Sequence, residues 1–543
     1  MGRAGRILGF LLVVVILLSV SAGGIKSGLA QSSVPQDTPP RQASLVVPIT
    51  EYEWWVIRWS NNQILCRVLI DHEGLPEGSE VLADCGQEVY TLWNSTSACQ
   101  ASEDAAAAAQ KCPGVYMFYV TNRPAEKTIL IDLPQPTVWV TLADCAPTSS
   151  ENLCPEIPSL FLTGEEPLPN EEITAIHTVI NNQKITCEGS TCRVPLRPTT
   201  PQGITVEFWA DTSYGDSSQV FSALVRVIDT GVSPDPKVAG WYVDVISSQW
   251  RGRSLASCAQ AWVTFPPLGG LPEWLVTPEV PELLASEEPY QFLAGRLIAQ
   301  RVVDASDCPS GGLMSNGYAN TCGLEKALPE VLEWQNQFDE RIIEVALQTG
   351  VPAQLMKNLF AKESQFWPGV FKSSEHMGIG QITSKGADAL LMWNQSFYEQ
   401  FCPLVLHNEV CDQGYLRLSA DQQAILRGAL ALEADGQCLD CPQGIDLTQT
   451  HFSVELFAQT LIANCQQVGQ IVHNASNQTA GRVSTYADLW QLTLANYHAG
   501  PGCLSYAVHS SWTLREALTW DNVSRHFTPV CEGVVDYVNQ ISQ

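Results

Sequence analysis

Basic side chains are scarce in this 543-residue chain: 29 lysines and arginines stand against 57 aspartates and glutamates, a formal net charge of −28. Nucleic-acid binding depends on cations that neutralise phosphates, and an anionic membrane surface also attracts cations. The charge balance therefore excludes nucleic acid as a partner and argues against an anionic membrane surface. It fits an exported protein but indicates no substrate.

Long apolar runs are also absent after the first thirty residues, so no later segment is expected to cross a membrane. Arg3 and Arg6 precede an apolar run over residues 7–20, and small residues continue to Ala30. This order is typical of an export signal. An uncleaved membrane anchor is the alternative, but the run is shorter than the roughly 20 residues that a span needs. We expect residues 1–30 to be a signal peptide and the mature protein to be secreted or associated with the cell envelope.

Cysteine is plentiful, and the eighteen residues permit full pairing in an oxidising compartment. Three close pairs are expected to close local loops: Cys99/Cys112, Cys145/Cys154 and Cys187/Cys192. Cys438 and Cys441 have the spacing of zinc ligands, but no matching pair lies nearby, so a disulfide is favoured over a metal site. Seven cysteines occur from Cys402 onward, so one of them should pair with Cys308 or Cys322, or stay free.

The chain is too long for one hydrophobic core, and its texture changes along the sequence. Residues 31–45 are polar and contain proline, as linkers do. Short strand patterns between turn residues predict a β-rich domain over 46–160 and a second β block over 161–232, for which we expect an immunoglobulin-like sandwich. Prolines interrupt residues 233–330, which we interpret as a connector with irregular structure.

Within the second β block, residues 185–194 are expected to form a hairpin with a disulfide across it. Residues 204–210 and 221–228 are expected to be paired strands. After residue 330 the pattern becomes helical. Apolar residues at helical spacing predict a helix that Gly350 ends, and Pro352 suits the first turn of the next one. Further helices are predicted at residues 420–433, 454–467 and 486–494.

Glu363 stands out in this helical part, because it lies on an apolar face, four residues after Leu359 and three after Phe360. No basic residue is three or four positions away, so no local cation offsets the cost of burying the carboxylate. Burial of this kind raises a carboxyl pKa and suits a general acid. The alternative is a glutamate at a helix end that faces water.

Four motifs follow one another in the C-terminal part: Glu363-Ser364-Gln365-Phe366, Gly378-Ile379-Gly380-Gln381, Asn496-Tyr497-His498-Ala499-Gly500-Pro501-Gly502, and Glu532 followed by Tyr537-Val538. In order and spacing they resemble the soluble lytic transglycosylases, lysozyme-like domains that cleave bacterial peptidoglycan. The resemblance covers residues 331–543 and implies a mainly α, lysozyme-like domain.

The resemblance also implies roles for single residues. Glu363 would act first as acid toward the glycosidic oxygen and then as base toward the C6 hydroxyl of the muramic sugar. That hydroxyl closes on C1 and leaves a 1,6-anhydro end, so one carboxyl suffices, unlike the carboxyl pair of ordinary glycosidases. Ser364, Gln381 and Tyr497 would line the groove, and Tyr537 would pack or hydrogen-bond near Glu363. No metal and no organic cofactor are implied.

Three of the departures from the family pattern lie in the motif segments around the predicted site. His498 replaces the usual asparagine and is expected to contact substrate with a pH-sensitive ring. Gly380 replaces methionine, which removes a side chain beside the groove. Glu375 stands where the family has a small residue; it is either a solvated loop charge or a second carboxylate that activates water.

The sequence therefore predicts a multidomain exported protein, with β-rich modules before a lysozyme-like lytic transglycosylase domain that cleaves the MurNAc–GlcNAc bond of peptidoglycan. The β-rich modules are candidates for contacts with the cell wall or with other proteins. Two alternatives remain open. One is a lysozyme-type hydrolase on the same fold, and the other is a non-catalytic wall-binding or scaffold protein.

Overall fold

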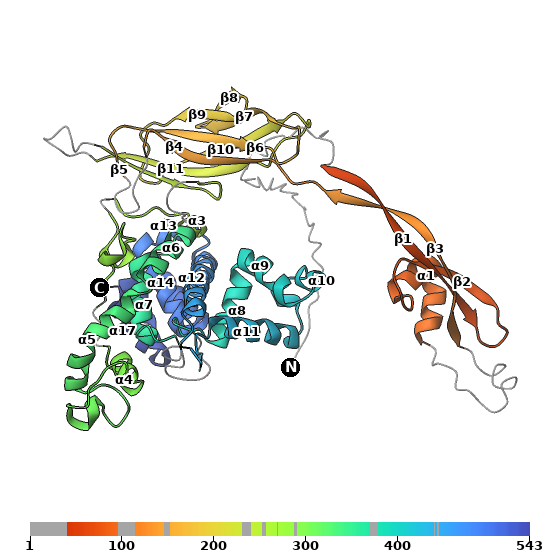
Figure 1. The fold of residues 1–543 in the computed structure, drawn as a ribbon. Coiled ribbons are helices and arrows are strands. Elements are labelled where there is room, and N and C mark those ends of the chain that lie inside the picture. The colour runs from red at the N-terminus through yellow and green to blue at the C-terminus, as the bar shows by residue number, and fades with distance from the viewer. Residues whose placement is uncertain are drawn as a thin grey trace, which may run out of the picture. The chain divides into compact units, whose positions relative to one another are not determined.

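The computed structural model (Figure 1) confirms the predicted order, in which a β-rich N-terminal part precedes a mainly helical C-terminal part. The predicted signal peptide lies outside the described residues. The structure describes residues 41–95, 114–145, 153–230, 240–251, 257–268, 270–286, 290–368, 378–438, 440–441 and 445–542.

The first β module is an antiparallel three-stranded sheet with one helix. Strand β1 (Gln42–Arg58) lies between β2 (Ile64–Ile70) and β3 (Val115–Asp132). Helix α1 (Gly78–Ser95) joins β2 through the Cys66–Cys85 disulfide. Residues 42–45, predicted as the end of a linker, are already part of β1. Few apolar residues are buried here, so the disulfide supplements a small core.

Two further sheets share one buried core. The first has the order β5-β12-β11-β10-β7-β8, and the second has the order β4-β6-β9. Burial alternates along β10, as expected for a strand with one face on a core. The predicted pairing of residues 204–210 with 221–228 is confirmed. The strands are β4 (Thr137–Ala143), β5 (Leu153–Cys154), β6 (Ser159–Glu165), β7 (Ile173–Ile180), β8 (Gln183–Glu188), β9 (Thr191–Pro195), β10 (Ile204–Thr212), β11 (Phe221–Asp229) and β12 (Trp241–Ile246).

The strand pairing crosses the boundaries that the sequence suggested. Strand β4 pairs with β6 along its whole length, so it folds with the second β block and not with the first. Strand β12, expected within the connector, pairs with β11. The predicted hairpin over 185–194 is wrong, because β8 pairs with β7 and β9 pairs with β6 in the other sheet. The expected Cys187–Cys192 disulfide is present and links the two sheets.

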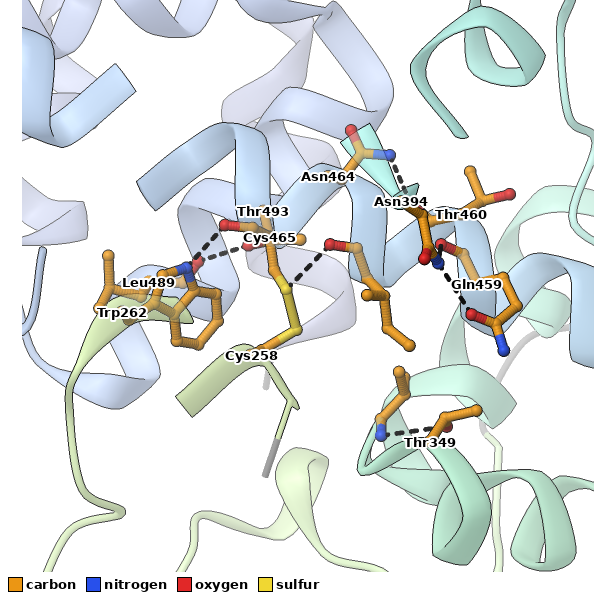
Figure 2. The surroundings of a disulfide bond; sticks show 12 residues. Cys258, Trp262, Thr349, Asn394, Gln459, Thr460, Asn464, Cys465, Leu489 and Thr493 are labelled. Carbon is orange, nitrogen blue, oxygen red and sulfur yellow. Dashed lines mark hydrogen bonds between the residues drawn. A yellow bond between two sulfur atoms is a disulfide. The ribbon is translucent and has the colours of Figure 1, made fainter. Parts of the chain in front are cut away.

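The connector is more ordered than its prolines suggest. It contains α3 (Ser257–Trp262), η1 (Glu273–Leu275), η2 (Pro281–Leu283), α4 (Gln291–Ala299) and η3 (Pro309–Gly312). Cys258 forms a disulfide with Cys465, and the Trp262 indole N–H donates to the Cys465 carbonyl at 2.8 Å (Figure 2). Trp262 also meets Trp490 edge to face, so the connector packs into the helical core.

The helical part is built on α12, a 30-residue helix that is buried along most of its length. The predicted helix ending at Gly350 is two helices, α5 and α6, and Gly350 ends the second with a φ of 74°. The helices are α5 (Thr321–Asn336), α6 (Asp339–Thr349), α7 (Ala353–Ser364), α8 (Ser384–Trp393), α9 (Gln395–Val405), α10 (Asn408–Cys411), η4 (Tyr415–Arg417), α11 (Ala420–Ala434), α12 (Leu447–Ser476), α13 (Ala480–Val483), α14 (Tyr486–Ala499), α15 (Pro501–Thr513), α16 (Trp520–Val523), η6 (Ser524–His526), η7 (Pro529–Cys531) and α17 (Gly533–Ile541).

Disulfide bonds join the described cysteines, and the Cys438–Cys441 pair is a disulfide. The sequence predicted a disulfide between one of the cysteines from Cys402 onward and Cys308 or Cys322, and this choice of partner is wrong. Cys465 bonds to Cys258, while Cys308 and Cys322 bond to each other. The expected Cys99/Cys112 pair lies outside the described residues. These bonds are compatible with an extracellular protein. In the part of the chain that the structure describes, no helix has the length and apolar character of a membrane span.

Candidate active site

The C-terminal end of α7 is held by contacts on both sides. Gln365 and Phe366 follow the helix with φ values of 50° and 61°, so the chain turns sharply there. The Gln365 side-chain carbonyl accepts hydrogen bonds from the backbone N–H groups of Phe292 and Leu293, at the start of α4. The Phe366 carbonyl accepts one from the Trp334 indole at 2.9 Å. Glu363 therefore lies on a part of the helix with little freedom to move.

Glu363 is 8% exposed, so its carboxyl is largely withdrawn from water. The Tyr537 hydroxyl donates a hydrogen bond to Glu363 Oε1 at 2.5 Å, from helix α17. Burial raises the pKa of Tyr537 well above its usual range, and the nearby Glu363 carboxylate and Tyr497 raise it further. The phenol therefore stays protonated at neutral pH and remains a donor to the carboxyl.

The segment from Gly378 to Gln381 packs beside this carboxyl-bearing helix end. The Ser364 hydroxyl donates to the Ile379 carbonyl at 2.6 Å, and the Gln381 amide donates to the Gly378 carbonyl at 2.9 Å. The Tyr497 hydroxyl donates to the Gly380 carbonyl. Ser364 and Gln381 are buried, so both shape the loop from within. Their predicted contact with substrate stays a prediction.

Tyr497 lies close enough to Glu363 for the two groups to interact electrostatically. Burial raises the pKa of Tyr497 well above its usual range, and the Glu363 carboxylate raises it further. Two protonated phenols, Tyr497 on α14 and Tyr537 on α17, thus lie near the Glu363 carboxyl. The structure brings Glu363, Ser364, Gln381, Tyr497 and Tyr537 together from segments far apart in the sequence.

Phe457 occupies the space where a side chain at position 380 would lie. A Cβ built on Gly380 would come within 2.0 Å of Phe457 Cδ2. The Phe457 ring also meets Tyr497 edge to face, with centroids 5.5 Å apart, and packs on Phe360 at 4.9 Å. The Phe457 ring from α12 therefore fills the space that Gly380 leaves by having no side chain. Sequence reasoning missed Phe457, since only the fold brings it to Gly380.

His498 is exposed and lies flat against the buried ring of Tyr537. The two ring centroids are 3.9 Å apart and the planes differ by 18°. The imidazole therefore contacts the residue that hydrogen-bonds Glu363. Asn496, two positions earlier, is buried, and its amide donates to Asn464 and Gln467 on the central helix at 2.8 and 2.7 Å.

Glu375, the possible second carboxylate, lies outside the described residues. Within the described ranges no three His, Cys, Asp or Glu side chains cluster as metal ligands would. Comparison with known proteins finds no matching family model, no matching curated protein and no matching solved structure.

Proposed function

We propose that this protein is a peptidoglycan lytic transglycosylase, secreted or held in the cell envelope, with Glu363 as its acid and base. The observation that carries the proposal is the buried Glu363 carboxyl with a protonated Tyr537 hydroxyl 2.5 Å from one of its oxygens. A phenol that remains a donor fixes the orientation of the carboxyl without adding a charge. The order of the motifs around it supports the assignment to a lysozyme-like fold.

Two proton transfers by one carboxyl account for the reaction. Protonated Glu363 gives its proton to the glycosidic oxygen as the bond between that oxygen and C1 of the muramic sugar breaks. The resulting carboxylate then takes the proton of the C6 hydroxyl, whose oxygen bonds to C1. The carboxyl is regenerated, no water is consumed, and the new chain end is a 1,6-anhydro sugar.

Burial of Glu363 serves both steps. A low-polarity surrounding disfavours the carboxylate before the first transfer, and it strengthens the interaction of the carboxylate with developing positive charge at C1 after the transfer. Tyr537 then holds one carboxylate oxygen in place, so that the other oxygen can be presented to the sugar.

Two finer structural proposals accompany this function. The pair of sheets formed by β4 to β12 is an immunoglobulin-like sandwich, supported by antiparallel strands from two sheets over one core. The β-rich modules hold the enzyme against wall glycan or against other envelope proteins. A sedimentation assay with purified peptidoglycan and the isolated residues 41–251 tests the second statement.

The decisive experiment is digestion of purified peptidoglycan by the full chain, with mass analysis of the fragments. We expect 1,6-anhydro ends from the parent protein. Glu363→Gln should lower the rate at least 1,000-fold, since the variant lacks the transferable proton. Glu340→Gln is the matched control, because Glu340 is an exposed residue of α6. Unchanged digestion by Glu363→Gln would refute the proposal.

The product also separates the two alternatives. Reducing ends that disappear in Glu363→Gln would assign a hydrolase, and Glu375→Gln would then test the second carboxylate. Binding of glycan without fragments, from a folded parent protein, would assign a non-catalytic wall-binding protein.

A further inference from the structure

Strands β1 and β3 form a long ribbon that extends beyond the end of β2. Strand β2 pairs with β1 only from Tyr52 onward, whereas β3 pairs with β1 from Gln42 to Arg58. Along β1 and β3, which the structure describes in full, only Val56 and Ile57 are buried. Most of the surface of these two strands is therefore left uncovered by the first β module.

Helix α1 covers one face of this module. Its Val81 shares a small core with Val56 of β1 and with Val68 and Ile70 of β2, and Trp54 packs against the same core. Side chains alternate between the two faces along a strand. Even-numbered residues of β1 therefore face α1, and odd-numbered residues face away from it.

The face turned away from α1, here called the outer face, is rich in apolar side chains. Residues that pair directly across an antiparallel sheet share a face, so the register assigns its members. The apolar members are Ala43, Leu45, Val47, Ile49 and Trp55 of β1, Leu69 of β2, and Phe118, Ala125, Ile129 and Ile131 of β3. Four of them are between 41% and 51% exposed, namely Leu45, Leu69, Phe118 and Ile131. A sheet face of this composition is normally buried against a second layer.

The charged side chains of the outer face are paired within the module. They form three ion pairs: Arg123 with Glu51, Arg67 with Glu53, and Lys127 with Asp71. The outer face is therefore close to neutral, although the whole chain carries a formal net charge of −28. A strongly charged partner would find little to recognise there. The layer that covers this face should itself be apolar and nearly neutral.

An identical outer face meets this requirement and has the area that a dimer needs. With about 3.3 Å per residue and about 4.8 Å per strand, the three strands cover roughly 650 Å². Two such faces packed together would bury roughly 1,300 Å², within the roughly 1,200–2,000 Å² of a standard stable interface. Identical sheets also have the same twist, so they can pack in the aligned way of a β-sandwich.

We propose that the outer face of the first β module is a homodimer interface, covered by the same face of a second copy of this chain. Residues 31–40, which precede β1, are a poor source of the covering layer, because Val34 is their only aliphatic residue apart from proline. The inference does not depend on the catalytic role of Glu363, so either proposal can fail without the other.

Sedimentation velocity of residues 31–543 tests the proposal over protein concentrations from about 0.5 to about 50 µM. We expect the mass of two chains at the upper end and dissociation on dilution. Leu45→Glu and Phe118→Glu each place a charge on the outer face at an exposed position, and each should raise the dimer dissociation constant at least 100-fold. Circular dichroism checks that the variants are folded.

Leu130→Glu is the matched control. Leu130 lies on the same ribbon and is 69% exposed, but it pairs with Ser44 and so belongs to the opposite face. This variant should dimerise as the parent does, and so should Glu363→Gln. A monomer at every concentration, or a dimer that neither outer-face variant weakens, would overturn the inference. Equal weakening by Leu130→Glu would also overturn it, since the association would then not be specific to one face.

Discussion

The imidazole of His498 stacks on the phenol of Tyr537 with ring centroids 3.9 Å apart, and the same phenol donates its hydroxyl hydrogen to Glu363. An exposed, titratable ring is thus two contacts away from the proposed acid. We therefore expect His498 to affect the proposed acid through Tyr537 as well as through any contact with substrate.

Tyr537→Phe removes the hydroxyl and keeps the ring. Glu363 then loses the hydrogen bond that fixes one of its oxygens, so we expect kcat on peptidoglycan to fall about 10- to 100-fold, with KM nearly unchanged. Steady-state digestion of soluble glycan fragments measures both constants. Tyr506→Phe, at an exposed position of α15, is the control. A rise in KM alone would show that Tyr537 binds substrate and does not orient the carboxyl.

His498→Ala removes the ring that covers Tyr537. Stacked aromatic pairs contribute about 0.5–1.5 kcal/mol, so a Tyr537 ring held less firmly should lower kcat by about 2- to 10-fold. His498→Phe keeps a flat ring and should recover much of the loss, but without a titrating group. Comparison of the kcat profiles between pH 5 and 8 separates stacking from charge. His509→Ala, exposed on α15, should behave as the parent.

Gly380→Ala should destabilise the protein, because its Cβ would come within 2.0 Å of Phe457. Overpacking of this kind costs about 1–3 kcal/mol in the free energy of unfolding. Phe457→Leu in the same chain should relieve part of the clash, so the double variant should lose less than the sum of the single losses. Urea denaturation of the four proteins measures this coupling. Strict additivity would contradict the contact.

A buried ion pair between α7, which carries Glu363, and α6 provides the fourth prediction. Lys357 Nζ lies 2.5 Å from Asp339 Oδ1, and both side chains are almost fully buried. Burial lowers the pKa of Lys357, and burial raises the pKa of Asp339 to about 6 despite the opposing effect of the lysine. Because the folded-state pKa of Asp339 exceeds the usual 3.8, its contribution to stability is complete below about pH 4 and is lost as the pH rises through 6.

Asp339→Asn should therefore flatten the pH dependence of the free energy of unfolding between pH 4 and 6. Parent and variant are compared by urea denaturation at several pH values, and equal slopes would contradict the assignment. Lys357→Met, which leaves the carboxylate alone in the core, should cost about 3–5 kcal/mol at pH 7. Lys385→Met, at an exposed site, should cost little.

The structural features that could be predicted from the sequence are those that depend on the spacing of residues close together in the chain. The face of α7 that carries Glu363 follows from apolar residues at helical intervals, and the strands at 204–210 and 221–228 follow from alternation. The pattern over 185–194 was misread, since two adjacent strands look alike whether they pair with each other or belong to different sheets. Within α12, residues 454–467 were found but the more polar ends were not.

The contacts of the site were less accessible to sequence reasoning. Phe457 meets Gly380, and His498 meets Tyr537, across long stretches of chain, so only tertiary packing brings each pair together. The odd number of cysteines after residue 401 left two outcomes, a partner further back or a free cysteine, and the first is observed. It could not identify Cys258, because spacing carries no information on which distant residues become neighbours.

The Cys258–Cys465 bond joins two residues 207 positions apart and closes a loop that contains Glu363. If an envelope protease cut the backbone once anywhere inside that loop, the two pieces would remain covalently joined. Such a nicked protein would migrate as one species on a non-reducing gel and as two after a reductant is added. Damage to the loop would thus leave the α12 core and the connector attached to each other.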